Sequence, residues 1–322
     1  MSQTEDALFA ALPPDLPNLV FISGQHRSGT TFLHQWLADT GRFNHVTPYD
    51  IVHFDELLSL QRDGGAAAAW DALDAEMKTG QTNRGLDECG VGAGVAEEYG
   101  FLLPKQGDFS FFTPSVRPDT RTRFEALCRK KLALDEAKRP LVLKNPDDHY
   151  FNFGAIAAWY PEARWVFTNR HPLAILNSQI KAWVGMLERP NGYFARISAF
   201  YHSVVSDETR RKWFLGLLQT RMQATHMLGQ MLDALDYYRE QLPLLPPGSW
   251  MSVRYEDVCA NPSTHLTQIA GFLGVPPPPG LEGVVQPRPM RILPVVQEVF
   301  DEQRERVEPL LEFLGYDSMV AR

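Results

Sequence analysis

The stretch FISGQHRSGTTF, residues 21–32, decides the fold class that we expect for this chain. Read from Gly24, it runs G-x-x-x-x-G-T-T, which keeps the glycine spacing of the phosphate-binding P-loop, G-x-x-x-x-G-K-[ST]. Thr31 also fits that pattern, but Thr30 stands where a P-loop has its lysine, and Arg27 lies inside the loop. The stretch therefore predicts a cradle for a phosphate-like anion that does not use the P-loop lysine.

The segments on either side of this loop supply the structural context that a P-loop requires. Residues 18–23, NLVFIS, form a short apolar run rich in strand formers. After the loop, TFLHQWLADTG has apolar residues at helical spacing and ends at Gly41. The order strand, glycine loop, helix is therefore predicted here.

The same order recurs later in the chain. Strands are predicted in PLVLKNPDD (140–148), ARWVFTNRHP (163–172) and SWMSVRYEDV (249–258), and a helical pattern follows each of them. Such alternation predicts a parallel sheet covered by helices on both faces. The expected fold class is α/β, with a P-loop-type parallel sheet flanked by helices.

Two regions interrupt the alternation, and we interpret them as insertions into one domain that spans residues 1–322. The first, approximately 60–135, is mixed, and the second, 185–245, is mainly helical with a long amphipathic pattern. Both are expected to build a lid or substrate wall over the sheet. The predicted core comprises residues 18–60, 138–185 and 248–276.

The composition limits the possible partners. The chain has 322 residues and a formal net charge of -8, so it has no general attraction for nucleic acid or for anionic membranes. An anionic ligand must therefore be held by a local cluster of cations. No stretch of about 18 apolar residues predicts a membrane span.

Cysteine usage and the N-terminus both favour a cytoplasmic location. The three cysteines, Cys89, Cys128 and Cys259, are far apart and odd in number, which argues against a disulfide framework and against a zinc site. The N-terminal residues include acids where a signal peptide needs bases. Both features are expected of a protein of the reducing cytoplasm.

Cations follow the predicted strand ends, where ligands bind to an open parallel sheet. The second strand ends at Lys144, and the third ends at Arg170, with Ser178 on the helix that follows. None of these ends carries the aspartate that holds Mg²⁺ in a P-loop NTPase, so we expect a highly anionic ligand handled without metal. The candidate ligand-binding residues of the first strand end are Gln25, His26, Arg27, Ser28, Gly29, Thr30 and Thr31.

These segments resemble the sulfotransferases that depend on 3′-phosphoadenosine 5′-phosphosulfate (PAPS), especially the branch with tyrosylprotein and many bacterial small-molecule sulfotransferases. The family's 5′-phosphosulfate loop, R-S-G-T-T, is matched by residues 27–31. Its 3′-phosphate motif, an arginine and a serine eight residues later, is matched by Arg170 and Ser178. Its K-x-P, V-x-Y-E-D and F-L-G segments are matched by residues 144–146, 253–257 and 272–274.

The resemblance implies how the donor binds. The loop would hold the 5′-phosphosulfate of PAPS, with Arg27 and the loop amides neutralising the 5′-phosphate that stays with the product, 3′-phosphoadenosine 5′-phosphate (PAP). Arg170 and Ser178 would bind the 3′-phosphate, and Tyr255 would lie near the adenosine. Two further candidates for a cation at the 3′-phosphate are Arg288 and Arg291.

The implied reaction is in-line transfer of the sulfuryl group to an acceptor hydroxyl. Lys144, helped by Arg27, would stabilise charge on the bridging oxygen as PAP leaves. A general base must take the acceptor's proton, and Asp50, in the stretch TPYD at 47–50, is the nearest match to the family's P-x-W-E-like segment. The other candidates for the base are, in order, His149, then His45 and His53.

The acceptor is expected to be a small hydroxylated molecule. Aromatic residues in 109–112 and 193–201 predict an apolar acceptor pocket, although ordinary core packing explains them equally well. Glu97 and Glu98 resemble an acidic segment common in the bacterial branch, which either lines the acceptor side or caps a helix. The net charge of -8 argues against a long anionic polysaccharide as acceptor.

Other functions stay open on the sequence alone. A P-loop kinase or NTPase would bind ATP with Mg²⁺ and would normally have the loop lysine that is missing here. A catalytically inactive PAP-binding protein would bind the product without turnover. A protein tyrosine as acceptor usually accompanies secretory targeting, of which the sequence shows no sign.

Overall fold

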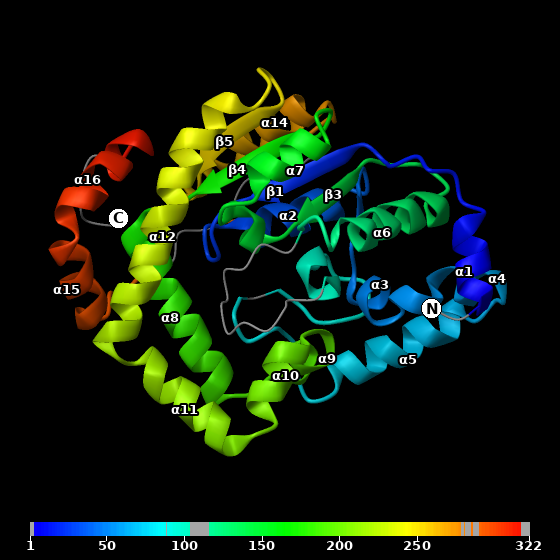
Figure 1. The fold of residues 1–322 in the computed structure, drawn as a ribbon, viewed down its shortest axis with the longest axis horizontal. Coiled ribbons are helices and arrows are strands. Elements are labelled where there is room, and N and C mark those ends of the chain that lie inside the picture. Colours follow the sequence, from blue (N-terminus) through cyan, green and yellow to red (C-terminus); the bar gives the residue numbers. More distant parts are fainter. Residues whose placement is uncertain are drawn as a thin grey trace.

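The computed structural model describes residues 3–87, 89–103, 116–277, 280, 285 and 290–316, and within these ranges five parallel strands form one sheet (Figure 1). Its strand order is β2-β3-β1-β4-β5, so β1 lies in the middle. This confirms the predicted α/β class with a parallel sheet. The strands are β1 (Leu19–Ser23), β2 (Asn44–His45), β3 (Leu141–Lys144), β4 (Arg164–Asn169) and β5 (Trp250–Arg254).

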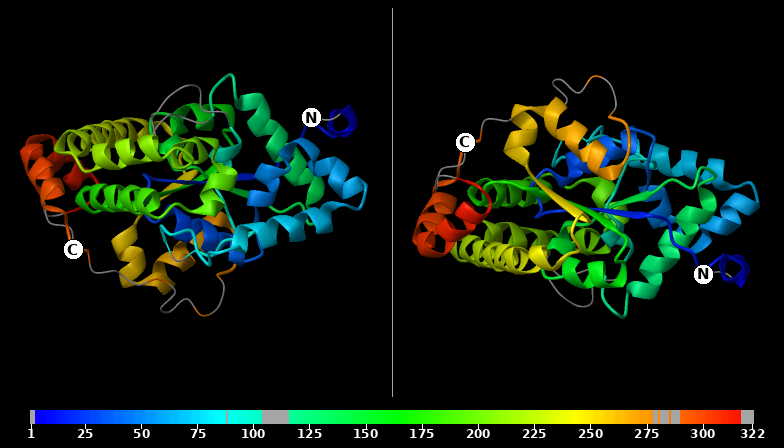
Figure 2. Two further views of the ribbon diagram at one scale, coloured as in Figure 1. Left: turned by 90° about the horizontal axis from the view of Figure 1, so that it is seen from below. Right: turned by 90° about the horizontal axis from the view of Figure 1, so that it is seen from above.

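Side chains of the strands alternate between two buried faces. Helices cover both faces of the sheet (Figure 2). Phe21 and Trp165 stack on one face, with ring centroids 4.3 Å apart, beneath α6, α7, α8 and α12. Val20 and Val166 lie on the other face, beneath α2 and α14. The helices next to the sheet are α2 (Thr30–Asp39), α6 (Arg121–Leu134), α7 (Phe153–Trp159), α8 (Pro172–Glu188), α12 (Arg221–Gln241) and α14 (Pro262–Leu273).

The remaining helices lie around this core, and two details of the secondary structure were not predicted from the sequence. The long amphipathic pattern is two helices, because Thr220 accepts a hydrogen bond from the Gln223 N–H and starts α12 anew after α11. Strand β2 was missed, because two residues carry no periodic signal. The α-helices are α1 (Gln3–Ala10), α3 (Pro48–Val52), α4 (Leu57–Arg62), α5 (Ala66–Lys78), α9 (Gly192–Ile197), α10 (Ala199–Val205), α11 (Glu208–Leu218), α13 (Tyr255–Ala260), α15 (Pro294–Glu302) and α16 (Arg304–Phe313). The 3₁₀ turns are η1 (Phe54–Glu56), η2 (Tyr99–Leu102), η3 (Pro146–His149) and η4 (Leu242–Leu244).

The register of the sheet places the predicted ligand-binding strand ends at one edge. Ile22 is paired with Lys144 across β1 and β3, and Ser23 is paired with Phe167 across β1 and β4. The loops that leave β1, β3 and β4 are therefore neighbours, as expected for a ligand site on an open parallel sheet.

Two sequence-based expectations concern the chain as a whole. All three cysteines are described and none forms a disulfide, but the cytoplasmic location inferred from them stays a prediction. None of the helices in the described ranges has both the length and the apolar character needed to cross a membrane. The assignment of residues 1–322 to one domain also stays a prediction.

Candidate active site

The loop after β1 is shaped to receive a ligand at the start of α2. Gly29 is the N-cap of α2 with a φ of 101°, and no side chain caps the helix. A Cβ atom at Gly29 would lie 2.4 Å from the Tyr255 ring, so only glycine fits. Arg27 also has a positive φ of 75°, a strained conformation that is common at functional sites. The uncapped first turn of α2 can therefore bind an anion through its backbone N–H groups.

The residues predicted to bind the donor lie together beside this loop. Arg27 Nε donates to Ser178 Oγ at 3.1 Å, and Arg27 Nη2 donates to the Leu86 carbonyl at 3.0 Å. Arg170 Nη1 donates to the Arg27 carbonyl at 3.0 Å, and its guanidinium lies 4.8 Å from the centroid of the Tyr255 ring. Loop, α8, α13 and the end of β4 thus contribute to one cationic site.

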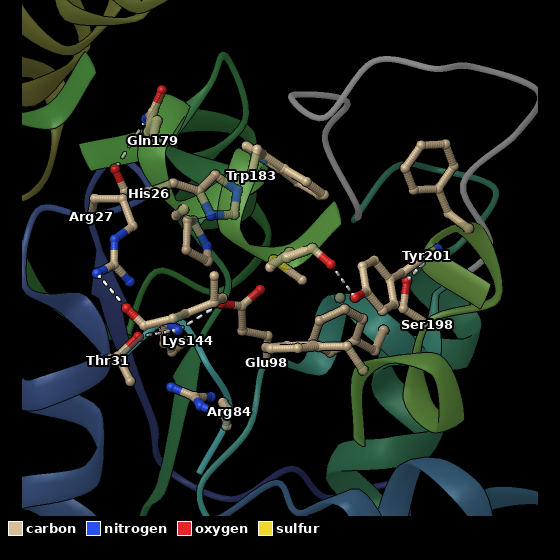
Figure 3. Close-up of a pocket in the computed structure, with 18 of the residues that line it drawn as sticks. His26, Arg27, Thr31, Arg84, Glu98, Lys144, Gln179, Trp183, Ser198 and Tyr201 are labelled. Carbon is tan, nitrogen blue, oxygen red and sulfur yellow. Dashed lines mark hydrogen bonds and ion pairs between the residues drawn. The ribbon is translucent and has the colours of Figure 1, made fainter. Parts of the chain in front are cut away.

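Lys144 reaches the same loop from the end of β3. Its ammonium group donates to Thr31 Oγ1 at 2.9 Å and to Glu98 Oε1 at 2.6 Å (Figure 3). Burial by itself would raise the pKa of Glu98, but the nearby Lys144 and His26 outweigh it, so that the pKa of this carboxyl lies below its ordinary value. Lys144 and Glu98 therefore form an ion pair next to the loop, in which Lys144 is buried and Glu98 is partly buried.

A cavity of about 800 Å³ lies in front of this ion pair, and its two ends differ in chemistry. Tyr201 lies on the far side of Glu98 from the loop in Figure 3. The polar end includes His26, Arg27, Thr31, Glu98 and Lys144. The apolar wall includes Phe101, Leu103, Trp183, Met186, Phe194 and Tyr201.

Both predicted insertions contribute to this cavity. Phe194, Phe200 and Tyr201, from the predicted aromatic stretch 193–201, belong to its lining. The other aromatic stretch, 109–112, lies outside the described residues. An apolar pocket beside the cationic loop is thus present, built in part from α9 and α10.

The remaining loop side chains differ in whether they bind the protein core or line the cavity. Gln25 Nε2 donates to the Met231 carbonyl at 3.0 Å, and Ser28 Oγ lies 3.0 Å from Thr168 Oγ1. Both side chains therefore fix the loop to the protein core instead of facing the cavity. His26 lines the cavity, with its Nε2 atom 2.9 Å from Asp147 Oδ1.

Asp50, the residue predicted from the sequence to be the general base, belongs to a capping box and lies outside the cavity lining. Its backbone N–H and Oδ2 form a capping box with Thr47, and Oδ2 also accepts from Lys131 Nζ at 2.8 Å. Asp50 is buried and is not among the residues that line the cavity. The capping box and Lys131 therefore hold this carboxylate outside the cavity.

The three histidines considered as bases also lie outside the cavity lining. His149 is buried, its Nδ1 atom lies 3.2 Å from Ser23 Oγ, and burial lowers its pKa to about 3. His45 Nε2 lies 3.3 Å from the Gly94 carbonyl, and His53 Nδ1 lies 2.6 Å from Glu56. These hydrogen bonds and contacts lie outside the cavity, so the part of these histidines in any reaction stays a prediction.

Sequence reasoning did not separate Glu97 from Glu98, and the structure gives them opposite environments. Glu97 is buried, with Arg84 Nη1 at 3.1 Å and the Tyr193 hydroxyl at 2.5 Å. Glu98 instead lines the cavity. Consecutive side chains of an extended segment point to opposite sides. This alternation could have predicted that only one of the two glutamates faces the cavity.

The late arginines are only partly described. Arg288 lies outside the described residues. The Arg291 carbonyl accepts from Asn177 Nδ2 at 3.2 Å, so its backbone lies beside α8, while its side chain is exposed. In the described part of the chain, no group of three or more His, Cys, Asp or Glu side chains is arranged to hold a metal ion.

Comparison with known proteins finds one matching family and several solved structures with a similar fold. A family model described as the sulfotransferase family matches residues 17–279. The fold resembles the sulfotransferase STF1 of Mycobacterium tuberculosis H37Rv, with a TM-score of 0.51 and 19% identity over 96% of this chain and 79% of that one. It also resembles the sulfotransferase STF9 of Mycobacterium avium, with a TM-score of 0.55 and 14% identity over 98% and 80%. No curated protein shows significant sequence similarity to the chain.

Proposed function

Because the chain belongs to the sulfotransferase family, we propose that it transfers a sulfuryl group from PAPS to a hydroxyl group of a small molecule and releases PAP. One observation carries this proposal. Arg27, Arg170 and Ser178 converge on the uncapped start of α2, while Lys144 reaches the same loop from the neighbouring strand. This arrangement supports a ligand with two separate anionic groups, as PAPS has.

The fit of the donor follows from the positions of these groups. The backbone N–H groups at the start of α2 and the Arg27 guanidinium would hold the 5′-phosphosulfate. Arg170 and Ser178, joined through Arg27, would hold the 3′-phosphate. The Tyr255 ring, which packs on Gly29 and Arg170, would lie beside the adenosine.

Lys144 and Glu98 are the groups that we propose to act in catalysis. The donor supplies the sulfuryl group, and PAP is the leaving group. Lys144, held between Thr31 and Glu98, would place its positive charge where the bridging oxygen gains negative charge. Glu98, on the cavity side of that pair, would accept the proton of the acceptor hydroxyl. The proposed base is therefore Glu98 and no longer Asp50.

The cavity supports an acceptor with an apolar body. Its volume of about 800 Å³ falls in the range of roughly 300 to 1,000 Å³ found for small-molecule sites. Phe101, Trp183 and Phe194 would cover the apolar part of the acceptor and exclude water from the reacting groups. An acceptor hydroxyl directed toward Glu98 would then lie at the polar end.

The experiment that tests the proposed function is calorimetric binding of PAP and of ATP, each without and with Mg²⁺. Tight PAP binding and weak ATP binding without Mg²⁺ are expected, because the loop lacks the P-loop lysine and the 3′-phosphate has its own cation. Good ATP binding that depends on Mg²⁺, together with weak PAP binding, would establish a P-loop kinase or NTPase instead. PAP binding without sulfuryl transfer to any alcohol of a broad panel would indicate an inactive PAP-binding protein.

Replacing Arg170 with alanine is expected to weaken PAP binding by about 10- to 100-fold, the value of a charge-assisted hydrogen bond to phosphate. Binding of adenosine 5′-monophosphate (AMP), which lacks the 3′-phosphate, should change by less than about threefold. Calorimetry with both nucleotides measures this difference. The control is Arg164→Ala, which removes an exposed arginine from the other end of the same strand. Equal losses for PAP and AMP would show that Arg170 does not recognise the 3′-phosphate.

A further inference from the structure

The C-terminal segment, residues 290–316, lies outside the region matched by the sulfotransferase family and still reaches the proposed donor site. Its helices α15 and α16 pack against α12, and α15 also packs against α8 (Figure 1). Helix α8 carries Ser178, and its N-cap, His171, directly follows Arg170. The segment is therefore in contact with the elements that carry Arg170 and Ser178, the two residues proposed to bind the 3′-phosphate.

The first contact runs through a single carboxylate. The Tyr316 hydroxyl donates to Glu256 Oε2 at 2.6 Å, and Glu256 Oε1 accepts from the His171 backbone N–H at 3.1 Å. Glu256 directly follows Tyr255, and His171 directly follows Arg170. One side chain thus ties the backbone at Arg170 to the helix that carries Tyr255, and Tyr316 fixes the orientation of that side chain.

Packing around Tyr316 keeps this contact in place. Its ring meets the His171 ring edge-on, with centroids 5.2 Å apart, and the Arg254 guanidinium lies 5.5 Å from its centroid. Arg254 also donates to the Gly315 carbonyl. Burial raises the pKa of Tyr316, and the neighbouring Glu256 raises it further, so the phenol stays protonated and acts as a donor.

The second contact fixes the helix turn that carries Ser178. Asn177 is completely buried; its Nδ2 donates to the Arg291 carbonyl at 3.2 Å, and its Oδ1 accepts from the Leu293 N–H at 2.9 Å. Both polar atoms of Asn177 are thereby satisfied by backbone groups of the C-terminal segment. Since Ser178 is the next residue, its hydroxyl position depends on this attachment.

We propose that the C-terminal segment positions Arg170 and Ser178, and that it thereby sets the selectivity of the protein for nucleotides with a 3′-phosphate. The inference rests on the proposed function. Tyr316 is a positioning residue that acts through Glu256 and the backbone of Arg170. A charge-assisted hydrogen bond from Arg170 to a phosphate depends on distance and angle, so a small displacement weakens PAP binding and leaves AMP binding unchanged.

The test is Tyr316→Phe, which removes one hydroxyl group and keeps the ring. We expect the ratio of PAP affinity to AMP affinity to fall by about threefold to tenfold, mainly through weaker PAP binding. The matched control is Tyr237→Phe on α12, which removes a hydroxyl that accepts from the Gly154 N–H at 3.2 Å, away from the donor site. This control should leave the ratio unchanged, whatever its effect on the melting temperature.

A double variant separates positioning from general damage. In the Arg170→Ala background, Tyr316→Phe should cause no further fall in the ratio, because the cation that it positions is gone. An unchanged ratio in Tyr316→Phe alone, an equal fall in Tyr237→Phe, or a further fall in the double variant overturns the inference. A wild-type protein that does not prefer PAP to AMP overturns the proposed function, and this inference with it.

Discussion

Replacing Lys144 with methionine is expected to lower kcat by about 10²- to 10³-fold, or about 3 to 4 kcal/mol of transition-state stabilisation. Methionine keeps the apolar stem of the side chain and removes the charge. PAP affinity should change by less than about threefold, because Arg27, Arg170 and the start of α2 would still hold the product's phosphates. Steady-state kinetics with PAPS and calorimetry with PAP measure the two quantities separately.

The chain offers a matched control in Lys131. Lys131 also forms an ion pair at the sheet periphery, with Asp50 at 2.8 Å, but it lies outside the cavity lining. Lys131→Met should therefore change the melting temperature without a comparable loss of kcat. If Lys144→Met keeps its full rate, or if it loses PAP affinity and kcat to the same extent, Lys144 has no special part in the transition state.

The grouping of the cationic loop with the two neighbouring strand ends could be predicted from the sequence, because its signals are local. The loop 24–31 shows its glycine spacing, and Lys144 and Arg170 each stand directly after an apolar strand. A parallel sheet aligns such ends at one edge, so a one-dimensional pattern is enough to bring them together. In the structure, Lys144 Nζ lies 2.9 Å from Thr31 Oγ1, as this alignment of strand ends predicts.

The cavity beside the loop could not be predicted to the same extent, because its contacts are not local. Glu98 becomes significant only through Lys144, which lies 46 residues further along the chain. No sequence pattern around Glu98 predicts its ion pair with Lys144. The apolar wall likewise joins two insertions, including Phe101 and Phe194, whose relative placement depends on the packing of α9 and α10.

Two local signals overlap at Asp50, which the sequence predicts to be the general base. The stretch Thr47 to Asp50 has the spacing of a capping box, with a hydroxyl residue followed three positions later by an acid. The structure contains that capping box, and Lys131 completes the bonding of the carboxylate. Resemblance to the family's P-x-W-E-like segment favoured catalysis, while the capping chemistry at the same position explains the residue more simply.

The first readout of the base assignment is the pH dependence. A general base acts in its deprotonated form, and Lys144 and His26 lower the pKa of Glu98 despite its burial. The value of kcat/KM, which reports the free protein, should therefore rise only below the ordinary glutamate pKa of about 4.3 and stay level above it. With the donor bound, its anionic groups would offset the positive charge of Lys144 and so raise the pKa of Glu98. The acid limb of kcat should therefore lie at higher pH than that of kcat/KM.

Glu98→Gln is expected to lower kcat by about 10²- to 10³-fold, the usual effect of losing a general base. Glutamine keeps the size of the side chain and a carbonyl oxygen for Lys144, so PAP affinity should stay within about threefold of the wild type. The matched comparison is Asp50→Asn, because Asp50 is likewise a carboxylate paired with a lysine but lies outside the cavity lining. Asp50→Asn should lower the melting temperature through the loss of the cap and keep kcat within about threefold. The reverse result, with kcat lost in Asp50→Asn and kept in Glu98→Gln, would return the role of base to Asp50 and would require α3 to rearrange when the acceptor binds.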